Sequence, residues 1–387
     1  MKTHPALASA IKVFQHDSST DWRMAAMGRA MLRAYHHRWL KSHNNITVLA
    51  TEATYTSSLV NPVTGRTSRK LSLAGKLDKV AEQDGKVLFD HKTTSEDIED
   101  PASNYWRLLA VDTQPKMYEL LLGQNGLEVE RIVWDVARKP RHSPRRISTA
   151  DCKELVATCE WFGSPVTADS VEWAIESLQE NAELFECRLY KELKDNTHKY
   201  FQRRSVPRVV EDLLDFAGDL WETGQRLLKT RKTARKLKNP SACLQYGRPC
   251  QFLGICSGHD RPDSARWQVK KDVHVELGDD VRDGRDVITN SRLRCYLQCE
   301  VKHYYQYEKG IQRTEDERTD ALYFGTLWHL AMDAWWAATS RGVTEDVNST
   351  EQPVYEVGTS EQLVAEDQQE VSQAAGNAGP DGQAGGR

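Results

Sequence analysis

Hydrophobic and polar positions alternate along residues 71–94 in the manner of two strands joined by a tight turn. Leu71, Leu73 and Leu77 fall mostly two residues apart, and a second apolar run follows. Between the two runs lies Asp84-Gly85, a pair that readily adopts the positive φ of a hairpin turn. The pattern therefore predicts a β-hairpin.

The same patterns predict elements elsewhere in the chain. Apolar residues at helical spacing predict a helix over residues 21–41. The segment 104–123 is also helical by pattern, but Pro115 interrupts it, so we expect a break near Asp112 with Asp112 or Thr113 as the N-cap of a second helix. Strands are expected at 47–59 and 129–136, and residues 150–238 are predicted to be mostly helical.

The hairpin carries charged residues that are unusual for a core element. Asp90 and Lys92 lie two residues apart in the second strand and therefore point the same way. The position of Asp78 in the first strand depends on the turn. A two-residue loop places Asp78 on the face opposite Asp90, whereas a three-residue loop or one bulge sets the two carboxylates directly across from each other. We expect the odd-length turn, at residues 83–85.

Two carboxylates and an ammonium at one sheet end have two interpretations. One is a solvated hairpin end with charges that keep the surface soluble. The other is a divalent-metal site, because hard cations take carboxylate oxygens and retain waters that can act as nucleophiles. Glu52, in the preceding strand, has the same two interpretations, an exposed strand residue or a support near the metal.

Three short motifs resemble the RecB-like branch of the PD-(D/E)XK nuclease superfamily. They are Gly-Lys-Leu-Asp at 75–78, Phe-Asp-His-Lys-Thr-Thr at 89–94 and Gln-Pro-Lys-Met-Tyr at 114–118, in the order found in that branch. The Val-x-x-x-Ala-Arg-Lys-Pro spacing at 133–140 is similar to a phage-associated subgroup. The resemblance implies that Asp78 and Asp90 bind Mg²⁺ or Mn²⁺ and that Lys92 acts on the attacking water. It also implies that Gln114 and Tyr118 hold the DNA end or orient the site.

Residues 290–336 resemble the beginning of such a nuclease domain, although they follow its end in this chain. The segment contains Gly325 and, four residues later, His329, in the places of a helix whose histidine joins the metal site. Either the domain is circularly permuted, or the chain is one domain followed by the truncated start of a second. Permutation predicts that His329 lies beside the metal-binding carboxylates and that the tryptophans near it cover the helix at 21–41 or the sheet.

Three cysteines lie within fourteen residues, Cys243, Cys250 and Cys256. They have two interpretations, a thiolate-ligated metal or cluster and unligated structural thiols. Several RecB-like nucleases hold a 4Fe–4S cluster with three late cysteines and one early one. The resemblance therefore implies such a cluster here, although the spacing is wider than usual, and the permutation argument names Cys299 as the fourth ligand.

Charge divides the chain unevenly. The net charge is −4, but residues 342–386 hold nine acidic residues and no Lys or Arg, and without them and Arg387 the chain has 51 basic against 47 acidic residues. Five cations cluster in the loop at 138–146, which suits phosphate contacts; they are Arg138, Lys139, Arg141, Arg145 and Arg146.

These features predict four regions: a nuclease core with its cysteine motif at 1–258, a linker at 259–286, a helical segment at 287–341 and a disordered acidic tail at 342–387. The start of the chain does not read as a signal peptide, and no apolar stretch approaches the roughly 20 residues of a membrane helix. A cytoplasmic location is therefore expected.

The resemblance implies a restriction-endonuclease-like α/β fold, a mixed central sheet flanked by helices, with a helical C-terminal part. It implies metal-dependent hydrolysis of DNA phosphodiesters, as an exonuclease in recombination or repair. DNA ends or single strands are the expected partners, together with a recombinase or helicase. The alternatives are a catalytically inactive DNA-binding or assembly subunit on the same fold, and a nuclease specific for RNA or single strands.

Overall fold

A computed structural model gives the arrangement of the chain. It describes residues 4–16, 21–43, 45–206, 209–245, 248–274, 277, 284–314 and 320–341. The predicted acidic tail lies outside the described residues.

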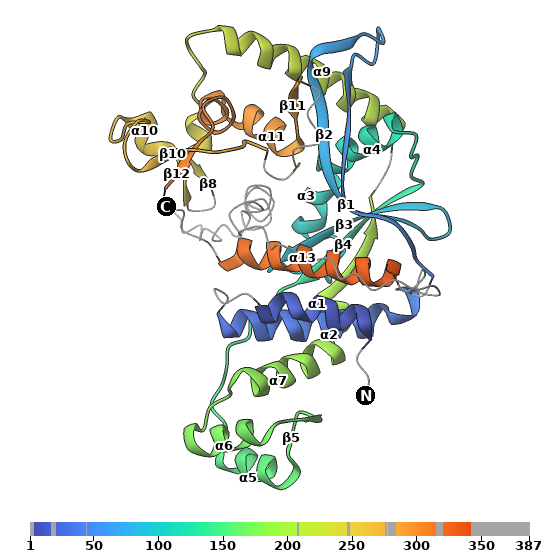
Figure 1. Cartoon of the computed structure of the whole chain (residues 1–387), viewed down its shortest axis with the longest axis vertical. Helices are drawn as coiled ribbons and strands as arrows, with labels where there is room; N and C mark the ends of the chain where they lie inside the picture. Colours follow the sequence, from blue (N-terminus) through green and yellow to red (C-terminus); the bar gives the residue numbers. More distant parts are fainter. Residues whose placement is uncertain are drawn as a thin grey trace, which may run out of the picture.

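A mixed six-stranded sheet forms the centre of the molecule (Figure 1). Its main strands follow the order β1-β2-β3-β4-β7, and β11 pairs with β2. The contacts β3–β4 and β11–β2 are parallel, and the others are antiparallel. The strands are β1 (Thr47–Val60), β2 (Thr67–Glu82), β3 (Lys86–Thr94), β4 (Arg131–Arg138), β7 (Phe201–Ser205) and β11 (Asp286–Ile288).

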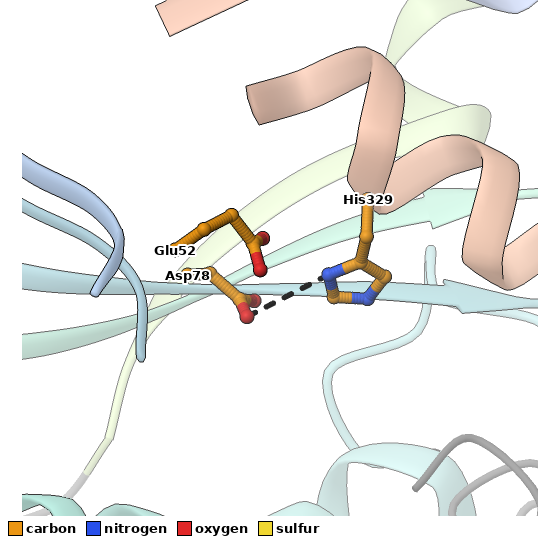
Figure 2. A group of neighbouring side chains, drawn as sticks. All are labelled: Glu52, Asp78 and His329. Atoms are coloured by element: carbon orange, nitrogen blue, oxygen red, sulfur yellow. Dashed lines mark ion pairs between the residues drawn. The ribbon is translucent and has the colours of Figure 1, made fainter. Parts of the chain in front are cut away.

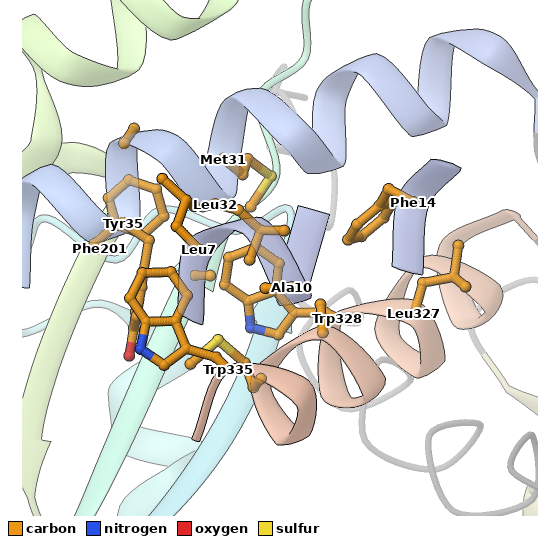
Figure 3. Packing of buried hydrophobic residues seen from close by; sticks show 14 of the residues in the cluster. Leu7, Ala10, Phe14, Met31, Leu32, Tyr35, Phe201, Leu327, Trp328 and Trp335 are labelled. Atoms are coloured by element: carbon orange, nitrogen blue, oxygen red, sulfur yellow. The ribbon is translucent and has the colours of Figure 1, made fainter. Parts of the chain in front are cut away.

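One side of the sheet is covered by three helices from the two ends of the chain, α1 (Pro5–His16), α2 (Trp22–His43) and α13 (Asp320–Arg341). The side chains of Trp328, Trp335 and Trp336 are each only 1% exposed. The rings of Trp328 and Trp335 meet Tyr35 of α2 edge-on, at centroid distances of 5.8 and 6.1 Å (Figure 3). The tryptophans of α13 therefore cover the helix predicted at 21–41.

The other side of the sheet is covered by α4 (Gln114–Gln124) and α9 (Val210–Lys232). As predicted, the helical segment after the hairpin breaks into two, because α3 (Asn104–Ala110) ends before α4 begins. Thr113 is the N-cap of α4, Pro115 lies in the first turn, and Asp112 Oδ1 accepts a hydrogen bond of 2.8 Å from the Gln114 amide. The break fixes where Gln114 lies relative to β3.

Between β4 and β7 the chain leaves the sheet. It forms α5 (Thr149–Thr158), β5 (Glu160–Trp161), β6 (Ser164–Pro165), α6 (Ala168–Ser177), α7 (Ala182–Asp195) and α8 (Thr197–Tyr200). These residues are mostly helical, as expected, but strand β7 was not predicted. Its sequence, FQRRS, has two arginines and no apolar alternation, so its pairing with β4 is set by tertiary contacts.

The remaining elements are short and lie in residues 240–313. They are η1 (Pro240–Ala242), β8 (Leu244–Gln245), β9 (Arg248–Pro249), α10 (Leu253–Ser257), β10 (Trp267–Val269), α11 (Asn290–Gln298), α12 (Glu300–His303), the π-helical turn η4 (Tyr304–Glu308) and β12 (Ile311–Arg313). Arg292, buried in α11, binds Asp286 of β11 with a nitrogen–oxygen distance of 2.7 Å. This ion pair anchors α11 to the sheet. The architecture confirms the predicted α/β class.

Candidate active site

The turn between β2 and β3 is three residues long, as predicted. Glu82 pairs with Lys86 and Lys79 pairs with Phe89, which leaves residues 83–85 in the loop. Asp84 and Gly85 have φ values of 50° and 101°. The regular pairing ends at Lys79 and Phe89, so Asp78 and Asp90 are the next residues beyond it on the two strands.

Strand β2 changes the phase of its side-chain alternation at Asp78. Leu77 and Val80 belong to the same core cluster although three residues separate them, whereas Ala81 belongs to the cluster on the other side. Thr51 of β1 pairs with Lys79 and Ala53 pairs with Leu77, so Glu52 lies opposite Asp78. The backbone of Glu52 has a φ of 46°. A glutamate in the left-handed region is uncommon and costs backbone energy. The irregularity brings two carboxylates together.

Glu52, Asp78 and His329 form a group able to chelate one ion, here called the chelating triad (Figure 2). One ligand atom from each lies within 4.8 Å of the others. The Nδ1 atom of His329 is 3.6 Å from Asp78 Oδ1, and the side chains of His329 and Asp78 are 24% and 12% exposed. Two carboxylates and an imidazole fit a divalent cation such as Mg²⁺ or Mn²⁺. His329 of α13 therefore lies beside Asp78, although the two residues are far apart in the sequence.

The charges of the triad are coupled. Burial raises the pKa of Asp78, but the charge and hydrogen bond of His329, with His91 and Lys92, outweigh burial and hold this pKa below its ordinary value. Burial and the charge of Asp78 raise the pKa of Glu52, against the effect of Lys76. Lys76 Nζ lies 2.7 Å from Glu52 Oε2. A bound cation would relieve the repulsion between the two carboxylates.

Asp90, Lys92, Gln114 and Tyr118 form a continuous chain of one ion pair and two hydrogen bonds. The ammonium of Lys92 is 2.7 Å from Asp90 Oδ2 and donates to Gln114 Oε1 at 2.8 Å. Gln114 Nε2 in turn donates to the Tyr118 hydroxyl at 2.9 Å. Asp90 lies outside the group of three chelating residues. Its role as a metal ligand stays a prediction.

The backbone of β3 links this chain to the triad. The amide of His91, between Asp90 and Lys92, donates to Asp78 Oδ2 at 2.6 Å. A shift of β3 would therefore move Asp78, Asp90 and Lys92 together. The structure thus brings the five predicted catalytic residues and His329 to one region, and adds Glu52, whose two interpretations the sequence left open.

A second polar cluster, which the sequence analysis missed, is buried beside the site. Asp135 of β4 lies 3.4 Å from His91 Nδ1 and 3.1 Å from Arg203 Nη2, and it accepts a hydrogen bond from the Tyr35 hydroxyl. Burial raises the pKa of Asp135, but Arg203 and His91 more than offset this and lower it. The sequence does contain a sign of this cluster, because Asp135 is the one charged residue within the apolar strand segment 132–137. We call this set the Asp135 network.

Several cations of the predicted DNA-binding loop contact protein groups. Arg138 Nη1 is 3.2 Å from Asp97, Arg141 donates to the Ser95 carbonyl at 3.0 Å, and Arg145 Nε is 3.8 Å from Glu180. Lys139 is buried and Arg146 is exposed. The proposed contacts of this loop with DNA stay a prediction.

All eight cysteines are free thiols. Burial raises the pKa of Cys250, and the neighbouring thiols of Cys243 and Cys299 raise it further. Burial also raises the pKa of Cys256, and the thiols of Cys250, Cys299 and Cys243 add to this rise, which indicates that the four thiols lie in one region. Tetrahedral zinc at about 2.3 Å from sulfur needs thiolates about 3.8 Å apart. Among the described residues, no three cysteine sulfurs lie within 4.8 Å of one another. A metal or cluster at these cysteines stays a prediction.

Comparison with known proteins gives one match. The family model of the PD-(D/E)XK nuclease superfamily matches residues 4–257 and 287–379. No curated protein and no solved structure matches the chain. Within the described residues, no helix is both long and apolar enough to cross a membrane.

Proposed function

Since the chain belongs to the PD-(D/E)XK nuclease superfamily, we propose that it is a metal-dependent nuclease that hydrolyses DNA phosphodiester bonds at the site formed by β1, β2, β3, α4 and α13. The observation that carries the proposal is the chelating triad, placed one strand from Lys92. Acidic ligands next to a lysine are the arrangement needed to activate water and to offset charge on a phosphate.

Each side chain has a proposed role. A divalent cation, when bound, supplies a Lewis acid and an acidic water. Glu52, Asp78 and His329 would hold it, with Asp90 as a further ligand. The ammonium of Lys92, fixed between Asp90 and Gln114, would orient the attacking water and stabilise negative charge on the phosphate. Tyr118 holds Gln114 in place and, with it, would contact the DNA end.

The Gln-x-x-x-Tyr element supports a finer assignment to the RecB-like branch, and with it exonuclease action on DNA ends in recombination or repair, alongside a helicase or recombinase. We also propose that residues 287–341 complete the nuclease domain as a permuted front. Burial of the α13 tryptophans and the contact between His329 and Asp78 support this proposal. A truncated second copy would not be expected to contribute side chains to the hydrophobic core of the first domain.

The test compares end-labelled linear DNA with circular DNA, each incubated with Mg²⁺ or with EDTA. We expect the linear substrate to be degraded from its ends, in Mg²⁺ only, and the Asp90→Ala variant to be inactive. Cleavage of the circle would assign an endonuclease. DNA binding without any cleavage in Mg²⁺ or Mn²⁺ would favour the inactive DNA-binding subunit.

We further propose that Cys243, Cys250, Cys256 and Cys299 hold an iron–sulfur cluster, in which each thiolate binds a separate iron and a wider spacing is accommodated. Anaerobically purified protein is expected to be brown and to contain iron. Cys299→Ser should reduce the visible absorption and the iron content, whereas Cys159→Ser, at an exposed thiol in the C-cap of α5, should change neither. Colourless protein without iron would contradict the cluster.

A further inference from the structure

Negative charge is concentrated in one part of the described structure, residues 148–180, which we call the acidic lobe. It comprises α5, β5, β6 and α6. The lobe has seven acidic residues and one basic residue, Lys153. Without the lobe and residues 342–387, the chain carries 50 basic against 40 acidic residues. A polyanionic substrate is therefore attracted by the rest of the chain and repelled by the lobe.

The sheet does not need the lobe. β4 and β7 are antiparallel neighbours, yet 62 residues separate the end of β4 at Arg138 from the start of β7 at Phe201. Such strands can be joined by a few residues. In Figure 1 the lobe lies at the lower end of the molecule, beyond α7. Leu184 and Cys187 of α7 pack on the lobe, whereas Phe185 and Leu189 belong to the main core.

The lobe is fixed in its orientation. The side chain of Glu180 is 0% exposed and accepts hydrogen bonds from Arg188 Nε at 2.6 Å, Trp161 Nε1 at 3.3 Å and the Arg145 amide at 3.0 Å. Glu183 of α7 accepts further hydrogen bonds from the hydroxyls of Ser170 and Thr167 in the lobe. A buried, fully bonded carboxylate of this kind specifies one arrangement of the elements around it. The lobe therefore presents a constant surface.

That surface combines apolar and acidic side chains. Five of the nineteen exposed large apolar side chains in the described structure lie in the lobe; they are Val156, Phe162, Trp173, Ile175 and Leu178. Trp173 of α6 is 48% exposed. Asp169, four residues before it, and Glu176, three residues after it, are also exposed and share its helix face. An exposed indole between two carboxylates favours a cationic side chain, which gains both a cation–π contact and an ion pair.

We propose that the acidic lobe is a docking site for a partner protein that presents an apolar segment bearing arginine or lysine, with Trp173 as its anchor. Charge complementarity selects the partner. Glu180 is buried and paired with Arg188, but the six other acidic side chains of the lobe are not buried, and against one basic residue they disfavour nucleic acid and favour a basic surface. Tryptophan is the residue type that contributes most to such interfaces. The proposal concerns a surface apart from the candidate active site and does not depend on nuclease activity.

The test measures binding of a fluorescein-labelled synthetic peptide of 18 residues, with arginine on one helical face and leucine on the other, by fluorescence anisotropy with the full chain. A twin peptide with glutamate in place of arginine is the negative control. We expect the arginine peptide to bind, with an affinity that falls as salt rises, and the twin not to bind. Trp173→Ala and the double variant Asp169→Lys/Glu176→Lys should each weaken binding at least about tenfold.

Trp22→Ala is the matched control, because Trp22 is 41% exposed and lies on α2, outside the lobe, where its ring meets Phe185 of the main core. Its removal should leave binding unchanged. The charge-reversal variant replaces exposed side chains only, so it tests the surface even if Trp173→Ala unfolds the lobe. Equal binding of the arginine peptide to the charge-reversal variant would overturn the proposal. So would a loss of DNA affinity in that variant, which would assign a nucleic-acid surface. A dimer in sedimentation that the same substitutions dissociate would assign a second copy of the chain instead.

Discussion

Strand β3 contributes to two polar clusters that balance their charges differently. Asp90 and Lys92 join the candidate active site, whereas His91, between them, points to the Asp135 network. In the Asp135 network the buried carboxylate has its own arginine and tyrosine. In the chelating triad, two carboxylates lie close together, and burial with the charge of Asp78 raises the pKa of Glu52. In the Asp135 network, the negative charge is compensated by a side chain of the protein. In the chelating triad, a bound cation would compensate the repulsion between the two carboxylates.

The difference indicates how stability and function are divided between neighbouring residues. A buried ion pair contributes little when intact but is costly to break, so the pair of Asp135 with Arg203 favours one packing of β3, β4, β7 and α2. Repelling carboxylates destabilise the protein alone and favour ligand binding. We therefore expect substitutions in the triad and the Lys92 chain to change activity, and substitutions in the Asp135 network to change stability.

The largest expected effect is on catalysis. Lys92→Ala should lower the rate of DNA cleavage by at least about a thousandfold, because a group acting directly on the attacking water is lost. Lys92→Met, which keeps the volume, should be as inactive, and thermal unfolding should show both variants folded. Lys191→Ala, at an exposed α7 pair with Asp195, should cleave normally. Cleavage by Lys92→Met at the wild-type rate would remove Lys92 from the mechanism.

The second expected effect is on stability. Asp135→Ala should lower the free energy of unfolding by about 3–5 kcal/mol, since Arg203 is left buried without its carboxylate. Denaturant unfolding measures this change. Asp97→Ala, which breaks the exposed pair with Arg138, should cost less than about 1 kcal/mol. If Asp135→Ala abolished cleavage with unchanged stability, the division between the clusters would be wrong.

The third expected effect is on metal dependence. His329→Ala should raise the Mg²⁺ or Mn²⁺ concentration for half-maximal cleavage at least about tenfold, because one ligand of the triad is lost. Isothermal titration with Mn²⁺ measures the same change without DNA. His198→Ala, at a surface histidine paired with Glu99, should leave metal binding unaltered. An unchanged metal requirement in His329→Ala would show that His329 only packs beside the site.

The smallest expected effect is on pH dependence. The pKa of Glu52 is raised by burial and by Asp78, and a carboxylate must be deprotonated to bind a cation. Mn²⁺ affinity should therefore fall as the pH falls toward this raised pKa, at a higher pH than an ordinary glutamate would give. Glu52→Gln should bind Mn²⁺ more weakly and lose this part of the pH dependence. The same pH profile in wild type and Glu52→Gln would mean that Glu52 is not a ligand.

Local sequence patterns predicted the elements that local chemistry decides. The odd-length turn followed from the face that Asp78 must occupy, and the helix break followed from Pro115 and the capping residues before α4. The family motifs placed Lys92, Gln114 and Tyr118 on facing elements. In each of these cases, the residues that set the structure are close together in sequence.

The remaining features depend on contacts between distant segments. Strand β7 forms by pairing with the edge of β4, although its own sequence lacks an alternation of apolar and polar residues. The left-handed Glu52 and the phase change at Asp78 need both strands to be in register. In the sequence, Asp135 is an isolated polar residue. Its partners Tyr35 and Arg203 lie 100 and 68 residues away and contact it only in the folded chain. No single-sequence pattern encodes such pairings.

The contact between His329 and Asp78 also has a consequence for protein synthesis. The two residues are separated by 251 positions, so a ribosome that adds 5–20 residues per second needs about 10–50 s between them. For most of that time the nascent chain contains the residues of β2 and β3 but lacks the imidazole and the tryptophans of α13. The chelating triad therefore assembles late in translation, after almost all the other described elements have been made. A chain arrested before α13 would present motifs of a nuclease without a complete metal site.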